Sequence, residues 1–111
     1  MQESQVETQD VVGSIPENKN TTVTTAGTPV TVNRTDGKDC TAVYVGNPSK
    51  GTRANDINDV LYVSFDGQAP TGNGVTLARG ESISVSGKIA VGSLKIDSNA
   101  NGTVAEIVLE G

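Results

Sequence analysis

The residues with the most potential for chemistry in this chain are the oxygen-bearing side chains of the segment N-D-I-N-D. Asn55, Asp56 and Asp59 stand within this segment, and Asp66 follows shortly after it. Clustered carboxylate and amide oxygens are ligands for Ca²⁺, and a pair of carboxylates is the catalytic machinery of most glycosidases. The spacing matches no Ca²⁺-binding loop, because the fixed Gly and the distant bidentate Glu of an EF-hand are absent. We therefore interpret the segment as a turn whose Asx side chains bond their own backbone.

Nucleophilic, redox and metal chemistry have few other residues to use. The 111 residues include no His and no Trp, and the one cysteine is Cys40. Without His there is neither a Ser-His-Asp triad nor a His-ligated metal, and one Cys forms neither an intrachain disulfide nor a CxxC site. Cys40 stands in an alternating strand pattern, where a small buried hydrophobe is the expected role. The sequence therefore predicts a protein that is not an enzyme and that has no catalytic residue, metal or cofactor.

The charge balance restricts the partners. Eight Lys and Arg residues against thirteen Asp and Glu residues give a formal net charge of −5, which argues against a nucleic-acid binder with a basic surface. The first twenty residues lack the basic start and apolar run of a signal peptide, and no stretch approaches the length of a membrane-spanning helix. The expected partners are therefore proteins, with no nucleic acid and no membrane. If a partner surface is acidic, the loop cations Lys50, Arg53, Arg79 and Lys88 are its expected contacts.

The elements that carry these residues are predicted to be strands. Val occurs fifteen times and Thr thirteen times, against four Leu, and β-branched residues suit the pleated surface of a sheet. We expect one small all-β domain over residues 21–111, with about eight short antiparallel strands in a sandwich or barrel. The expected strands are 22–24, 30–33, 40–45, 60–66, 75–77, 83–85, 94–96 and 103–109, with a brief strand at 89–91.

Three local features of this pattern carry expectations of their own. Both faces of residues 40–45 are largely apolar, so this strand is expected to be central and covered on both sides. Gly87 is expected to interrupt the strand that contains Ile83. Residues 46–59 form the longest stretch without a strand pattern, and a loop of this length in a compact domain is more often functional than decorative.

The first 20 residues are predicted to form an extended or flexible N-terminal arm outside the domain. They are polar and weakly acidic apart from an apolar group at Val11, Val12 and Ile15, and Pro16 interrupts any helix that starts earlier. One interpretation is a loosely tied terminal segment. The other is an arm that becomes ordered on a neighbouring subunit, with the three apolar residues as its anchors.

The aromatic content limits the core. Tyr44, Tyr62 and Phe65 are the three aromatic residues. Each lies in a strand pattern, and we expect all three in the core, where aromatic side chains bury the most area. A core built mainly from Val, Ile and Ala is thin, so we expect marginal stability as a monomer. Association into a homodimer or binding to a large partner surface would correct this.

Several segments of the second half of the chain resemble small β-modules on the virions of tailed DNA phages. They are Val60–Gly67 (VLYVSFDG), Gly74–Leu77 with Arg79–Ser82, Gly92–Ile96, and the final TVAEIVLEG. In length, acidity and lack of catalytic residues, the chain is similar to the capsid decoration proteins (staple or cement proteins) of epsilon15-type tailed double-stranded DNA phages. The resemblance implies a jelly-roll-like fold and a homodimer on the outer surface of the icosahedral capsid. There it would join neighbouring major capsid proteins and stabilise the shell against the pressure of packaged DNA.

The resemblance brings no contact residues with it, so the expected shell contacts come from the pattern, namely the loop 46–59 and the N-terminal arm. Three other functions stay open. A phage fibre or baseplate β-domain would recognise a glycan or protein on the host surface. A binding β-sandwich of another class is disfavoured for sugars by the absence of Trp and the expected burial of Tyr. An enzyme is the least favoured, because the residues for catalysis are few.

Overall fold

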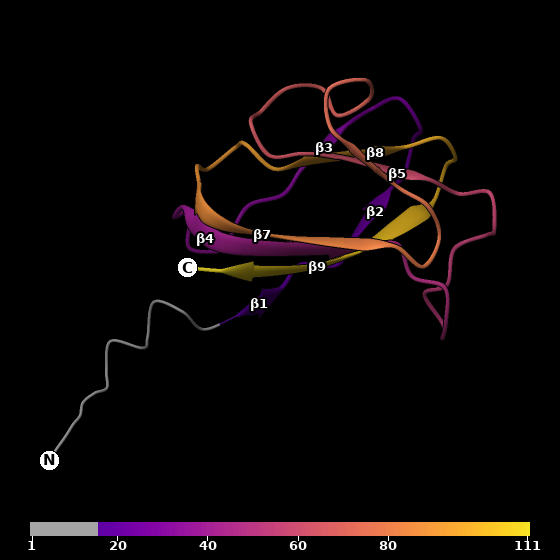
Figure 1. The fold of residues 1–111 in the computed structure, drawn as a ribbon, viewed down its shortest axis with the longest axis horizontal. Helices are drawn as coiled ribbons and strands as arrows, with labels where there is room; N and C mark the ends of the chain where they lie inside the picture. The colour runs from indigo at the N-terminus through magenta and orange to yellow at the C-terminus, as the bar shows by residue number, and fades with distance from the viewer. Residues whose placement is uncertain (1–15) are drawn as a thin grey trace, which may run out of the picture.

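The computed structural model describes residues 16–111, and this part of the chain is an all-β sandwich without a helix (Figure 1). Its strands are β1 (Glu17–Asn18), β2 (Thr21–Val23), β3 (Val30–Thr31), β4 (Cys40–Gly46), β5 (Leu61–Ser64), β6 (Val75–Leu77), β7 (Ser82–Ile89), β8 (Lys95–Ser98) and β9 (Thr103–Glu110). Between residues 16 and 111, no helix has the length and hydropathy needed to cross a membrane.

The strands form two antiparallel sheets that stack as two layers (Figure 1). One sheet has the order β1-β9-β4-β7, with β2 also paired to β9, and the other has the order β3-β8-β5-β6. Because β1 and β2 pair with successive segments of β9, they serve as one interrupted strand. β3 then pairs with β8, β4 with β7 and β5 with β6, so one long antiparallel ribbon is rolled into two sheets. This is a jelly-roll topology, and the all-β prediction is confirmed.

The core lies between the two sheets and consists of aliphatic side chains. Along β9 every second side chain from Thr103 to Leu109 is buried, as the alternation of that segment predicts. β5 contributes Leu61 and Val63, both fully buried. Phe65 is half-buried and packs against the core. The other buried apolar residues are Val23, Val32, Cys40, Val43, Val45, Leu77, Ile89, Leu94, Ile96, Ala105 and Ile107.

β7 continues through Gly87, so the predicted interruption of this strand is wrong. Cys40 pairs with Ile89, whereas Ala42 pairs with Ser86, which leaves an extra residue on β7 and forms a β-bulge. Gly87 has a φ of 118°, a conformation that residues with side chains rarely adopt. The glycine therefore bends the strand while pairing continues beyond it. The brief strand expected from Ile89 onward is also wrong, because Ile89 is the last residue of β7.

β4 lies centrally in its sheet, but the prediction that both of its faces are covered is wrong. Val43 and Val45 are buried in the core, whereas Tyr44 is 37% exposed on the outer face. Each sheet of a two-layer sandwich has one covered face, so apolar residues on the other face meet solvent. Cys40 itself lies opposite Ile89 and belongs to the core cluster, and burial raises the pKa of its thiol.

The sheet begins at Glu17, within the segment that the sequence assigns to the arm. β1 pairs Glu17 with Leu109 at the edge of the five-stranded sheet. The Lys19 N–H continues the contact by donating to the Ile107 carbonyl oxygen at 2.8 Å. The three predicted anchors of the arm, Val11, Val12 and Ile15, lie outside the described residues, and their role stays a prediction.

Candidate partner-binding surface

Two asparagine side chains fasten the long loop that follows β4. The Asn47 amide is 2% exposed and donates to the carbonyl oxygens of Asp59 and Leu77, at 3.0 Å each. Asn55 donates to Asn47 Oδ1 and to the Val104 carbonyl oxygen at 2.8 Å each, and it accepts from the Val104 N–H at 2.9 Å. Buried polar networks whose members are all paired specify one conformation. The loop is therefore long but firmly held.

The N-D-I-N-D segment uses its side chains for this loop structure. Beyond the contacts of Asn55, the Asp56 N–H donates to Asp59 Oδ2 at 3.1 Å, and the Asp59 N–H donates to the Asp56 carbonyl oxygen at 3.0 Å. Asp66 lies after β5 in the other sheet, where its carboxylate accepts from the Gln68 N–H at 3.2 Å. Within residues 16–111, no three His, Cys, Asp or Glu side chains are grouped closely enough to hold a metal ion.

Three of the four predicted cations gather at the end of the sandwich where β4 ends and β7 begins. Lys88 lies near the other end of β7 and forms an ion pair with Asp39, with Nζ and Oδ2 3.5 Å apart. Lys50 lines a hollow of about 220 Å³ whose other walls include Tyr44 and Glu106; we call it the Tyr44 hollow. Arg53 forms an ion pair with this Glu106, with Nη2 and Oε2 2.9 Å apart. The Arg79 guanidinium lies 3.5 Å from the carbonyl oxygen of Ser49, another lining residue. The structure thus brings Arg79 next to the loop that carries Lys50 and Arg53, while the role of the three cations as partner contacts stays a prediction.

The charges around the Tyr44 hollow differ in how they are compensated. Arg53 is neutralised by Glu106, and the Glu81 carboxylate accepts from the Ala78 N–H at 2.8 Å, which stabilises the turn before β7. Lys50 is exposed, and neither it nor Arg79 forms an ion pair with another residue of the described range. These two cations are therefore available to carboxylates of a partner.

Tyr44 is the site residue that the sequence interpretation misses. Its ring lies over Gly46, because a Cβ added at Gly46 would be 2.6 Å from the Tyr44 hydroxyl oxygen. On the other side of Tyr44, a second hollow of about 220 Å³ passes along the outer face beside Ser84 and Val108. The pattern contains the missed signal. A strand of a two-layer sandwich buries only one of its faces. In β4 the buried face is the one with more Val residues, and the face with Tyr44 is left to solvent.

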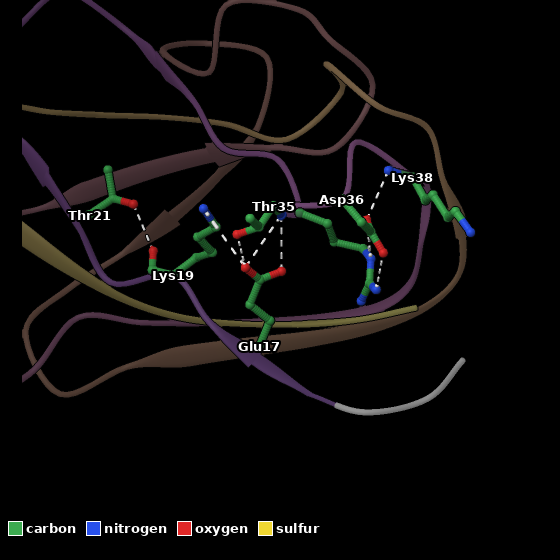
Figure 2. A network of polar contacts seen from close by, with 7 residues as sticks. Glu17, Lys19, Thr21, Thr35, Asp36 and Lys38 are labelled. Carbon is green, nitrogen blue, oxygen red and sulfur yellow. Dashed lines mark hydrogen bonds and ion pairs between the residues drawn. The ribbon is translucent and has the colours of Figure 1, made fainter. Parts of the chain in front are cut away.

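At the other end of the sheet, a polar network holds β1 against the loop between β3 and β4 (Figure 2). The Glu17 carboxylate accepts from the Thr35 N–H at 3.1 and 3.3 Å and from the Thr35 hydroxyl, and it lies 3.8 Å from Lys19 Nζ. The hydrogen bonds from Thr35 lower the pKa of Glu17. The Thr21 hydroxyl donates to the Lys19 carbonyl oxygen at 2.7 Å, so the chain is held at successive points.

The adjacent Asp36 completes this network. Its carboxylate accepts from the Arg34 guanidinium at 2.7 and 3.1 Å and from the Lys38 N–H at 3.0 Å. These contacts lower the pKa of Asp36 to about 2, with the Arg34 hydrogen bonds as the main cause. The loop that receives β1 therefore keeps its own shape through charge-assisted hydrogen bonds.

The two fastened segments lie at opposite ends of the five-stranded sheet (Figure 1). Along β9, Glu17 is opposite Leu109, whereas Gly46 at the end of β4 is opposite Glu106. The loop 46–59 continues from Gly46 beyond the sheet, away from the end at which β1 begins. The sandwich therefore separates the loop 46–59 from the start of β1.

Comparison with known proteins identifies no relative of this chain. No family model, curated protein or solved structure matches the chain. A functional conclusion therefore depends on the site itself and on the resemblance stated for the sequence.

Proposed function

We propose that this chain is a structural virion protein that binds the outer surface of an icosahedral phage capsid and joins neighbouring major capsid proteins, working as a homodimer. The observation that carries the proposal is the pair of firmly held segments at opposite ends of one jelly roll. A module that touches one capsid subunit at each end links the two subunits. Attachment at two points also raises the effective concentration of the second contact, so that weak individual contacts suffice.

The charges of the loop end support this function. The chain carries a net charge of −5, so attraction to an acidic partner needs local cations. Lys50 and Arg79 provide them at the Tyr44 hollow, without a carboxylate partner in the described chain. Exposed charges act mainly on the rate and the salt dependence of association. The proposed attachment therefore weakens as the salt concentration rises.

Co-sedimentation tests the proposal. The purified protein is mixed with tailed-phage shells from which the decoration has been stripped, and we expect it to pellet saturably at a fixed ratio to the major capsid protein. The variant Lys50→Glu is expected to bind about fivefold more weakly, as for one exposed ion pair. Lys95→Glu is the matched control, because its ammonium lies on the other sheet beside the Thr31 hydroxyl. No pelleting of the wild-type protein on a competent shell would overturn the proposal.

Removal of residues 1–15 tests the second contact. The Glu17–Thr35 network belongs to residues 16–111, so the shortened protein is expected to keep its circular dichroism spectrum. We expect it to bind the shell more weakly than the full chain does. Unchanged attachment would mean that the arm does not contribute to shell binding, and the loop end would remain as the only proposed contact.

Recognition of a host surface, as by a fibre or baseplate β-domain, is the second candidate, and Tyr44 is the observation that favours it. A partly exposed aromatic ring beside the carboxylate of Glu106 and the hydroxyl of Ser82 combines an apolar surface with polar groups, as ligand sites do. The chain has no Trp and two Tyr, so a bound glycan would change the tyrosine fluorescence. A change that disappears in Tyr44→Ala, together with no shell binding, would favour this candidate.

A further inference from the structure

The free edge of β7 is a feature that the proposed capsid contacts leave unused. β7 pairs with β4 on one side, and no strand within residues 16–111 pairs with its other side. It has eight residues, whereas the edge strands β3 and β6 of the other sheet have two and three. A long edge presents unpaired N–H and C=O groups to which another strand can add.

The hydrogen-bond alternation identifies the free backbone groups. The Asn47 N–H donates to the Glu81 carbonyl oxygen at 2.9 Å, one step beyond the last pair of the β4–β7 ladder. Hydrogen-bonded and non-bonded pairs alternate along an antiparallel ladder, so Ile83 and Val85 direct their N–H and C=O groups toward β4. The free edge therefore carries the backbone groups of three serines, Ser82, Ser84 and Ser86.

The side chains of the same segment are divided between two faces. The serines are exposed on the outer face, and Ile83 and Val85 are half-buried against the core. Residues 82–86 have the sequence S-I-S-V-S, in which serine alternates with a β-branched residue whether the segment is read forward or backward. An antiparallel copy centred on Ser84 therefore places Ser opposite Ser on the outer face and Ile opposite Val on the inner face.

We propose that β7 pairs with β7 of a second copy of this chain, antiparallel, across a two-fold axis at Ser84. Ser84 then exchanges two backbone hydrogen bonds with its equivalent, and Ser82 exchanges two with Ser86 of the second copy on either side. Ile83 and Val85 cover each other across the axis, which adds apolar burial. The two five-stranded sheets become one continuous sheet.

The residues that flank the paired segment favour a second copy as the occupant. In this register the paired segment 82–86 carries no charged side chain, and Glu81 stands opposite Gly87 of the second copy, which has no side chain, so no like charges face each other across the edge. The bulge beside Gly87 ends the regular edge. Because both copies use the same edge, the assembly closes at two. The inference rests on the homodimer of the proposed function and adds the surface that joins the copies.

Single cysteines test this register in solution, without a shell. Ser84→Cys places two thiols at the axis, with Cα atoms about 5.5 Å apart, which is within disulfide range. Ser86→Cys is the matched control, because position 86 faces position 82 of the second copy. With oxidised glutathione we expect covalent dimers from Ser84→Cys and from a mixture of Ser82→Cys with Ser86→Cys, and none from Ser86→Cys alone. Equal cross-linking of Ser84→Cys and Ser86→Cys, or none in Ser84→Cys, would overturn the register.

A proline at the same position tests the affinity of the two copies. The Ser84 N–H points to the free edge, so Ser84→Pro keeps the β4–β7 ladder and removes the central pair. By sedimentation equilibrium, we expect a dimer dissociation constant raised at least about tenfold, whereas Ser84→Thr stays near the wild type. A wild-type protein that is monomeric at about 100 μM, or a dimer that Ser84→Pro leaves unchanged, would overturn the inference. Shell binding by a monomer would refute this interface while sparing the virion function.

Discussion

The two ends of the five-stranded sheet are held by different kinds of polar contact. The loop end uses neutral amides, since Asn47 and Asn55 are 2% and 7% exposed and pair with each other. The end at β1 uses charged groups near the surface, centred on Glu17 and Asp36. A buried network of paired amides is costly to break but does not titrate, whereas exposed carboxylates respond to pH and salt. The loop end is therefore held rigidly, whereas the contacts that hold the β1 end respond to pH and salt.

Asn55→Ala should break the rigid end and cause the largest effect. It removes the partners of Asn47 Oδ1 and of both backbone groups of Val104. Because partly buried groups without partners cost about 1 to 3 kcal/mol each, we expect the free energy of unfolding to fall by about 3 kcal/mol. Urea denaturation measures this loss. Asn58→Ala in the same turn is the control and should change the free energy by less than about 0.5 kcal/mol; equal losses in the two variants would contradict the network.

Gly46→Ala should have a smaller effect at the same end. The new methyl group would meet the Tyr44 hydroxyl at 2.6 Å, so the tyrosine ring has to swing away from the sheet. We expect a loss of about 1 kcal/mol and faster quenching of tyrosine fluorescence by acrylamide. Gly102→Ala tests a glycine of another kind, because its φ is 81° and no atom lies within 4 Å of an added Cβ. It should strain the backbone without changing the quenching. An unchanged quenching rate in Gly46→Ala would contradict the position of the ring.

Acid should loosen the β1 end selectively, which is the smallest of the three effects. The pKa of Glu17 is lowered from 4.5 in the folded protein, so its stabilisation is complete above that value and is lost as the pH falls through the lower, folded pKa. Asp36 adds a second loss between its ordinary pKa of 3.8 and about 2. Hydrogen exchange should therefore show falling protection of the Lys19 N–H below pH 4.5, with little change at the Asn55 N–H.

Glu17→Gln provides the control for the acid effect. The amide oxygen still accepts from Thr35, but the group no longer titrates. Protection at the Lys19 N–H should then depend less on pH over the range in which Glu17 titrates. An identical pH dependence in the wild type and the variant would remove Glu17 as the acid-sensitive contact.

Alternation and turn residues predict most of the fold. β9 follows the expected alternation. β5 buries Leu61 and Val63 as expected, but it also buries Ser64, which the alternation assigns to the other face. The turn interpretation of the Asp56–Asp59 segment agrees with its hydrogen bonds. The errors arise where the tertiary arrangement decides. Gly87 occupies a bulge because β4 and β7 keep pairing beyond it, and Tyr44 is exposed because the second sheet covers the other face of β4. The connection order also depends on long-range pairing, which local patterns do not contain.

The candidate site was predictable in part for the same reason. Loop length marks residues 46–59, and residue type marks Lys50, Arg53 and Arg79, but their common position around one hollow depends on the packing of β4 against β7 and β9. The roles of Asn47 and Asn55 were hidden, because asparagine in a turn usually bonds locally, whereas these side chains reach Leu77 and Val104.

The melting temperature of stripped shells, with and without the added protein, tests the central claim most directly. A protein that links neighbouring capsid subunits from both ends should raise this temperature saturably, and removal of residues 1–15 should reduce the gain even at concentrations at which the shortened protein is fully bound. A smaller gain in melting temperature at full binding would distinguish a protein that links two capsid subunits from one that only attaches to the shell. Shells that melt at the same temperature with and without saturating protein would contradict the account.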